Sequence, residues 1–152
     1  MEIERKFLVK RSPPAWKALA GTRIQQGYFP LSRKDLEIRL REKGSQCVIT
    51  IKVGRGTVRL EEEIHISRLR FQRLWVLVRA ASIIKTRYRI PCANHTIEMD
   101  IYQERHRGLR TADVEFRSRR EAESFAPPQW LGREITGNRH YANESLARRK
   151  RT

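Results

Sequence analysis

Charged or polar residues alternate with apolar ones in one segment of this chain after another. In the first such segment, Glu37, Arg39 and Arg41 alternate with the apolar residues at positions 36, 38 and 40. Because neighbouring residues of a β-strand point to opposite faces, this pattern predicts a strand with one charged and one apolar face. The pattern recurs in 49–53, 58–64, 84–90, 97–101 and 112–116. With 2–9 and 24–31 added, we expect about eight strands.

Turns and helices complete a mainly β (α+β) fold class. Lys43-Gly44-Ser45 and Gly54-Arg55-Gly56 suit hairpins, and such short connections imply antiparallel neighbours. The clearest helix is predicted for Ser67 to Ala80, where Leu69, Leu74 and Leu77 recur at helical spacing. Shorter helices are predicted in 14–20, 119–125 and 139–149.

The charged positions of these strands favour a closed sheet. A single strand of this kind usually turns its charged face to water. Here the acids are grouped in pairs along the strands: Glu2 with Glu4, Glu61 with Glu63, Glu98 with Asp100, and Asp113 with Glu115. A closed eight-stranded antiparallel β-barrel, with a charged interior and an apolar outer face flanked by a few helices, accounts for all the rows together. Its interior would be a tunnel that focuses an electric field on a bound anion.

The first strand carries a candidate metal and phosphate site. Glu2, Glu4 and Lys6 occupy every second position and would share one face. Carboxylate oxygens suit a hard divalent cation such as Mg²⁺ or Mn²⁺. The lysine beyond them suits the phosphate that such a cation carries.

Composition narrows the partners and the compartment. Lys plus Arg number 33 against 17 acids, and the resulting net charge of +16 favours nucleic acid, polyphosphate, nucleotides or acidic membranes. Cys47 and Cys92 have no CxxC spacing, so neither a disulfide framework nor a cysteine zinc site is expected. The chain shows no long apolar segment and no secretory signal, so we expect a cytoplasmic protein without a membrane partner.

The ordered series of charged motifs resembles the CYTH superfamily, the triphosphate tunnel metalloenzymes. After Glu2-x-Glu4-x-Lys6, the matching motifs are Arg39-x-Arg41, Thr50-Ile51-Lys52, Arg59-x-Glu61-x-Glu63, Lys85-Thr86-Arg87-Tyr88, Glu98-x-Asp100 and Asp113-x-Glu115. Residues 132–137 and 141–147 are similar to the C-terminal signature of short bacterial members. The resemblance covers nearly the whole chain and implies a single tunnel domain over 1–147, followed by a basic tail over 148–152.

The resemblance also implies roles for individual residues. The implied phosphate ligands are Lys6, Arg39, Arg41, Lys52, Arg59 and Arg87. The implied ligands of Mg²⁺ or Mn²⁺ are Glu2, Glu4, Glu63, Asp113 and Glu115, although similar proteins often have Glu in place of Asp113. We expect Glu61, Glu63 or Asp100 to hold a second metal. Tyr28 and Lys85 match a pair that has been proposed to help activate water, and Lys85 is equally suited to bind phosphate.

We therefore expect a divalent-metal-dependent triphosphatase, a phosphoanhydride hydrolase. Inorganic tripolyphosphate, cleaved to pyrophosphate and phosphate, is the preferred small-molecule substrate. The alternatives are another activity of this superfamily, such as an adenylate cyclase or a thiamine or nucleoside triphosphatase, and a non-catalytic protein that binds polyphosphate or nucleic acid. An outer sheet face left uncovered by helices could serve a homodimer.

Overall fold

The chain folds into two compact units that share the strand β6. The computed structural model describes residues 3–31, 33–54 and 60–149. Among the described residues, the first unit comprises 23–84 and 142–149, and the second comprises 3–22 and 85–141. Strand β6 (Ser82–Cys92) begins in the first unit and continues in the second.

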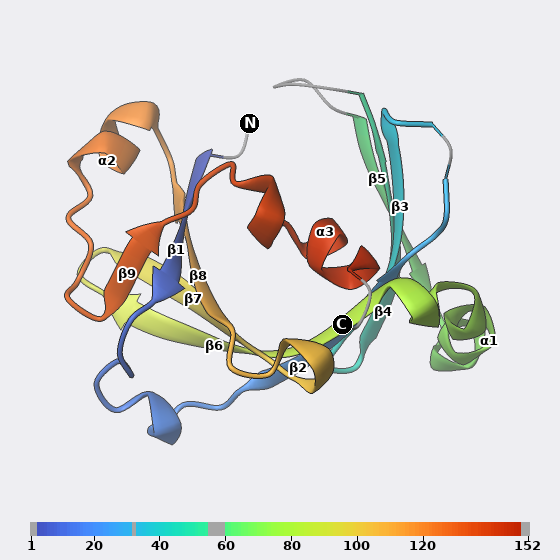
Figure 1. Ribbon diagram of the computed structural model, residues 1–152, viewed down its shortest axis with the longest axis horizontal. Coiled ribbons are helices and arrows are strands. Elements are labelled where there is room, and N and C mark those ends of the chain that lie inside the picture. Colours follow the sequence, from blue (N-terminus) through green and yellow to red (C-terminus); the bar gives the residue numbers. More distant parts are fainter. Residues whose placement is uncertain (1–2, 32, 55–59, 150–152) are drawn as a thin grey trace. The chain divides into compact units, whose positions relative to one another are not determined.

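Antiparallel strands in the order β5-β4-β3-β2 build the sheet of the first unit (Figure 1). Their bounds are β2 Thr22–Tyr28, β3 Leu36–Lys43, β4 Gln46–Val53 and β5 Leu60–Ile66. The predicted hairpin at Gly44 is confirmed, with a positive φ of 58° that glycine adopts without strain. The hairpin predicted at Gly54-Arg55-Gly56 reaches residues outside those described.

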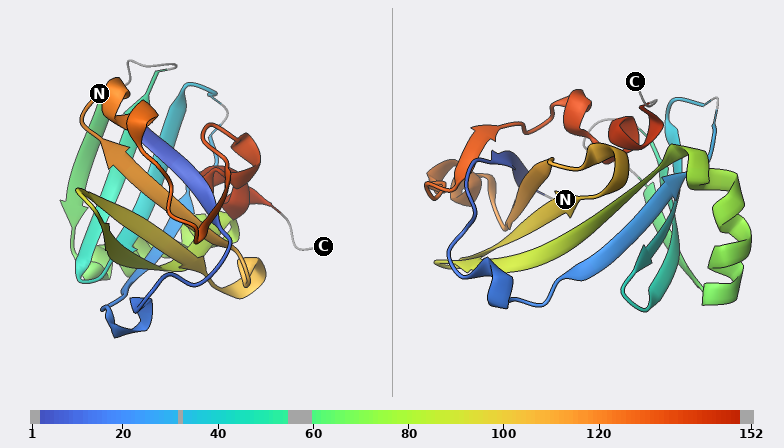
Figure 2. Two further views of the ribbon diagram at one scale, coloured as in Figure 1. Left: turned by 90° about the vertical axis from the view of Figure 1, so that its left-hand side faces the viewer. Right: turned by 60° about the horizontal axis from the view of Figure 1, so that its bottom comes forward.

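Two helices flank opposite faces of this sheet, as Figures 1 and 2 show for α1 (Arg68–Val78) and α3 (Asn143–Arg148). The hydroxyl of Ser67 caps α1 by accepting a hydrogen bond from the Arg70 amide at 3.1 Å. Phe71 of α1 is buried against Leu40 of the apolar sheet face. Two residues of the predicted apolar stripe are not in this core, because Leu69 is 56% and Leu77 58% exposed.

Five strands in the order β6-β7-β8-β1-β9 form the sheet of the second unit. Besides β6, their bounds are β1 Ile3–Val9, β7 His95–Tyr102, β8 Arg110–Phe116 and β9 Leu131–Glu134. The strand β9 was not among those predicted. The helix α2 (Arg119–Ser124) packs on the apolar face, where Phe7, Met99 and Val114 are buried.

A short 3₁₀ turn replaces the helix predicted over 14–20, whereas the segment predicted as a helix over 139–149 forms a 3₁₀ turn followed by α3. The segment predicted as a helix over 14–20 is reduced to η1 (Trp16–Ala18), and η4 (Arg139–Tyr141) precedes α3. Further 3₁₀ turns are η2 (Arg79–Ala81) and η3 (Glu104–His106). The predicted basic tail begins inside α3, since Arg148 is the last residue of that helix.

The predicted mainly β class with a few helices is confirmed, as is the separation of a charged from an apolar face in each unit. The described strands number nine rather than about eight. Their order, β5-β4-β3-β2-β6-β7-β8-β1-β9, has two ends, so the predicted closure into a barrel is not seen in the described part of the chain. No helix within that part is long and apolar enough to cross a membrane.

Candidate functional site

Cross-strand pairing gathers the predicted cations of the first unit on one face. Arg39 lies opposite Tyr28 on one side and Thr50 on the other, and Thr50 lies opposite Glu63. Residues that are directly opposite in antiparallel strands point to the same face. A neighbouring row joins Gln26, Arg41, Val48 and His65, and a third joins Glu37, Lys52 and Glu61.

This charged face is well suited to bind an anion. A polar hollow of about 170 Å³ lies on it, lined by Arg41, Lys43, Gln46, Val48, Thr50, Glu63 and His65. Beside it, the Nε of Arg39 is buried, and no residue within the described ranges accepts its hydrogen bond. A buried donor of this kind is stabilised when an anionic oxygen reaches it. On the opposite face lies an apolar cavity of about 540 Å³, which offers a triphosphate no such donors.

Tyr28 is buried at the end of β2 and keeps its proton. Its hydroxyl accepts a hydrogen bond from Nε2 of Gln26 at 2.9 Å. Burial raises the pKa of Tyr28 to about 12, although the Arg39 charge opposes the shift. At neutral pH the group is therefore a phenol that can donate a hydrogen bond. The sequence pattern did not single out Gln26, although its place two residues before Tyr28 puts both side chains on one face.

The acidic side chains of the first unit make long, partly exposed or unfavourable contacts. Lys52 approaches Glu61 at 3.9 Å, with both side chains partly exposed. Glu37, which lies opposite Lys52, is close to the carboxyl group of Glu144 of α3. Burial raises the pKa of Glu37, and the contact with Glu144 raises it further. The helix α3 therefore contacts the charged face of this unit, in agreement with its place in Figure 1.

A buried ion cluster crosses β6 and β7 in the second unit. The Nζ of Lys85 lies 2.8 Å from Oδ2 of Asp100, and both side chains are 1% exposed. Arg87 donates to both oxygens of Asp100, from Nε at 2.8 Å and from Nη2 at 2.9 Å. Burial alone would raise the pKa of Asp100, but the two cations hold it below its ordinary range. Burial lowers the pKa of Lys85 to about 8; Arg87 adds to this shift and Asp100 opposes it.

Carboxyl groups of β1 and β8 lie together on the same face. Glu4 is opposite Glu115, and Lys6 is opposite Asp113. Burial raises the pKa of Glu4 to about 7, with a further contribution from the nearby carboxyl of Asp113. Burial also raises the pKa of Asp113. The Oδ1 of Asp113 is buried and accepts no hydrogen bond from any described residue.

This pair of carboxyls fits a hard divalent cation. Two neighbouring acids whose pKa values are raised, with a buried oxygen that lacks a donor, offer oxygen ligands to such a cation. The described residues contain no group of three or more His, Cys, Asp or Glu side chains close enough to hold a metal. Glu115 is exposed, and Glu2, the other predicted ligand of β1, lies outside the described residues.

The predicted site residues thus divide between the two units. The first unit holds Tyr28, Arg39, Arg41, Lys52, Glu61 and Glu63 on one face. The second holds Glu4, Lys6, Lys85, Arg87, Asp100, Asp113 and Glu115. Arg59, like Glu2, lies outside the described residues. Glu98 was not predicted as a site residue, although it lies opposite Asp113 and its carboxylate is 3.6 Å from Arg87.

A β fold with paired acids and with arginines on its charged faces suits a protein that binds phosphates through a metal. The family comparison agrees: the CYTH domain matches residues 1–149, and this chain belongs to the CYTH domain family.

Named relatives match over nearly their full length. The inorganic triphosphatase of Nitrosomonas europaea is 36% identical over 148 residues, covering 96% of each chain. The inorganic triphosphatase of Acetivibrio thermocellus is 35% identical over 150 residues, covering 97% of this chain and 93% of the relative. Among solved structures, the crystal structure of the inorganic triphosphatase NE1496 matches with a TM-score of 0.82 and 33% identity, covering 100% of this chain and 97% of that one.

Proposed function

We propose that this protein is a phosphoanhydride hydrolase that cleaves inorganic tripolyphosphate to pyrophosphate and phosphate with the help of a divalent metal. The observation that carries the proposal is the carboxyl pair of Glu4 and Asp113, with its buried oxygen that accepts no described hydrogen bond. The two relatives named inorganic triphosphatase support the choice of substrate, because each matches this chain over nearly its whole length.

The basic residues would hold the phosphates. Hydrolysis of a phosphoanhydride depends mostly on in-line positioning and on neutralising the charge that spreads over the oxygens. We assign this to Lys6, Arg39, Arg41, Lys52, Arg59 and Arg87. Arginine suits the role because its planar guanidinium can bind two oxygens at once. Arg87 uses Nε and Nη2 to hold Asp100, while its Nη1 is directed to Glu98 at 3.6 Å.

Glu4, Asp113 and Glu115, with Glu2, would hold the metal, which we propose to be Mg²⁺ or Mn²⁺. When bound, the metal polarises phosphoryl oxygens and lowers the pKa of a bound water. Glu61 and Glu63 are the candidates for a second metal. Asp100 has both oxygens engaged by Lys85 and Arg87, so we assign it the role of holding these cations in place.

Lys85 and Tyr28 have different capacities for proton transfer. A lysine with a pKa of about 8 exchanges its proton near neutral pH, which suits a general acid or base. Tyr28, whose pKa is raised to about 12, remains a hydrogen-bond donor under the same conditions. We therefore propose that Lys85 moves the proton and that Tyr28 only orients a neighbouring group.

A phosphate-release assay tests the proposal. Purified protein with Mg²⁺ or Mn²⁺ should release phosphate from tripolyphosphate faster than from pyrophosphate, ATP or thiamine triphosphate, and a chelator should abolish the release. Formation of cyclic AMP from ATP would instead establish a cyclase. Salt-sensitive binding of RNA without metal-dependent turnover would establish a nucleic-acid binder. A cytoplasmic location and a homodimer stay predictions.

A further inference from the structure

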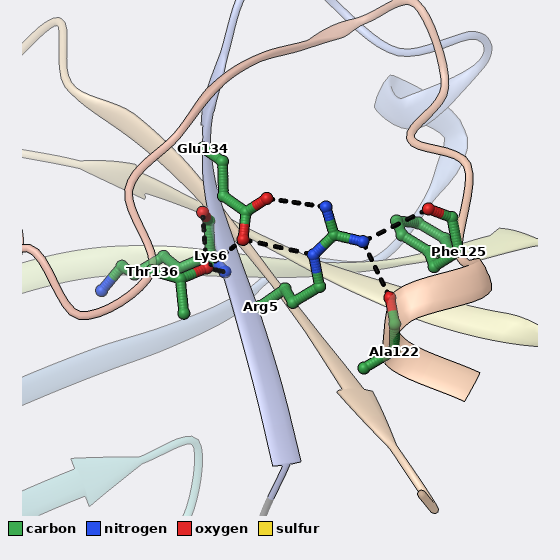
Figure 3. Close-up of polar contacts among 6 residues, drawn as sticks. All are labelled: Arg5, Lys6, Ala122, Phe125, Glu134 and Thr136. Atoms are coloured by element: carbon green, nitrogen blue, oxygen red, sulfur yellow. Dashed lines mark hydrogen bonds and ion pairs between the residues drawn. The ribbon is translucent and has the colours of Figure 1, made fainter. Parts of the chain in front are cut away.

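Arg5 lies between Glu4 and Lys6 in the sequence, but its side chain is on the opposite face of β1. Figure 3 shows its guanidinium directed to Glu134 of β9. Nη2 donates to Oε1 of Glu134 at 2.6 Å, and Nε donates to Oε2 at 3.2 Å. This two-pronged geometry fixes the plane of the guanidinium as well as its distance. Arg5 therefore joins β1 to β9 by a side-chain contact in addition to the strand pairing.

The same guanidinium also holds the end of α2. Its Nη1 donates to the carbonyl oxygen of Ala122 at 2.8 Å and to that of Phe125 at 3.2 Å (Figure 3). The last carbonyls of a helix lack partners within the helix and attract a cation. The guanidinium also lies 5.2 Å from the ring centre of Phe7, a favourable cation–π distance. One side chain thus ties β1 to both β9 and α2.

Thr136 continues the hydrogen bonding along the edge of β1, next to the proposed metal ligand Glu4. Regular pairing of β1 with β9 covers Phe7 opposite Glu134 and Val9 opposite Leu131, with an irregularity between them. Past Phe7, the Lys6 amide donates to Oγ1 of Thr136 at 3.0 Å, and the Lys6 carbonyl accepts from the Ile135 amide at 2.8 Å. The Thr136 hydroxyl in turn donates to Oε2 of Glu134 at 2.6 Å.

We propose that Glu134 and Thr136 are positioning residues, which set the orientation of Glu4 and Lys6 through Arg5 and the Lys6 backbone. This inference rests on the proposed function. Since alternate residues of a strand point to opposite faces, fixing Arg5 on the apolar side directs Glu4 and Lys6 to the charged side.

Repulsion between neighbouring acidic side chains would displace the charged side of β1 if no contact fixed its position. Glu4 lies opposite Glu115 and close to Asp113, so repulsion among these acids opposes the close approach that a metal site needs. The segment after β9 holds Lys6 a second time, because the Lys6 Nζ donates to the Tyr141 carbonyl at 3.3 Å. A displacement of about 1 Å in such a group can reduce catalysis by about 10²-fold.

Thr136→Val tests the inference, because it removes the hydroxyl and keeps the side-chain volume nearly unchanged. We expect about a 10-fold loss of Mn²⁺ affinity, the lower end of what partners behind metal ligands contribute. Mn²⁺ binding is measured by electron paramagnetic resonance without substrate, beside kcat, KM and the unfolding midpoint. Thr136→Ser keeps the hydroxyl and should restore the affinity.

Thr86→Val is the matched control. Thr86 belongs to the same unit, and its hydroxyl accepts a hydrogen bond from the Gln103 side chain at 3.0 Å, away from β1. This variant should bind Mn²⁺ like the wild type. Glu134→Gln provides a second variant if Thr136→Val does not fold, and it should also weaken Mn²⁺ binding.

The outcomes separate this inference from the proposed function. A folded Thr136→Val protein with wild-type Mn²⁺ affinity would overturn the positioning role, whatever the enzyme hydrolyses. Equal losses in Thr136→Val and Thr86→Val would overturn it as well. If the wild type binds Mn²⁺, loses affinity on Thr136→Val alone, and leaves tripolyphosphate intact, the positioning role stands and the proposed function fails.

Discussion

The charged faces of the two units differ in how their charges are neutralised. In the second unit, Asp100 accepts from Lys85 and Arg87 in a cluster that water hardly reaches. In the first unit, Lys52 and Glu61 are 3.9 Å apart and partly exposed, and the buried Nε of Arg39 has no described acceptor. A buried charge or donor costs free energy until it is paired, either by a group of the protein or by a bound ligand. The second unit therefore neutralises its Lys85–Arg87–Asp100 cluster internally, whereas the first unit keeps a buried donor for an anionic ligand.

Removing the acid of the buried cluster should have the largest effect. Asp100→Asn leaves Lys85 and Arg87 buried without their counter-charge, which typically costs about 3–5 kcal/mol of unfolding free energy. Urea unfolding followed by circular dichroism measures the loss. Glu61→Gln, which breaks the exposed pair of the other unit, should cost less than about 1 kcal/mol. Similar losses in both variants would remove the contrast between the two faces.

Removing one proposed ligand from each face should have the second-largest effect. Glu4→Ala in the second unit and Arg41→Ala in the first should each lower kcat/KM for tripolyphosphate by about 10²-fold or more, as the loss of one transition-state donor does. The Glu4 variant should also require more Mn²⁺ for half-maximal activity, whereas the Arg41 variant should not. Undiminished activity in both would contradict the site.

A conservative change at Arg39 tests whether its guanidinium on the first face binds phosphate. Arg39→Lys keeps the charge and removes the buried Nε and the planar fork. We expect KM for tripolyphosphate to rise about 10-fold, the equivalent of about 1.4 kcal/mol, with a smaller change in kcat. Arg23→Lys, at an exposed position of the same unit, is the control and should leave steady-state kinetics unchanged.

Tyr28→Phe should have the smallest effect. Because the pKa of Tyr28 is raised to about 12, its phenol is neutral below about pH 10 in both the folded and unfolded protein. The stability due to this shift is present below that pH and is lost as the pH rises through 12. The variant should lower kcat a few-fold at most and leave the pH–rate profile between pH 6 and 9 unchanged. A profile that loses one ionisation would show that Tyr28 acts as a base.

Local periodicity explains why most strands could be predicted. The period of two in 36–41 and 112–116 is a property of neighbouring residues, and these segments form β3 and β8 as expected. The four residues of β9, Leu131-Gly-Arg-Glu, are too few and too mixed to show a period, so this strand was missed. Leu69 and Leu77 fit the helical period, but the sheet covers only one side of α1 and leaves them exposed.

The sequence by itself determined which side chains share a face, and therefore the two sets of candidate ligands. Only the tertiary structure decided how they pair, because pairing joins residues far apart in the chain. It placed Glu4 beside Asp113, and it engaged Asp100, a predicted metal ligand, with Lys85 and Arg87. It also gave Arg5 its contact with Glu134, which lies 129 residues away. Alternation along a strand fixes the face to which each side chain points. Contact between strands depends instead on register and burial, which no local sequence pattern records.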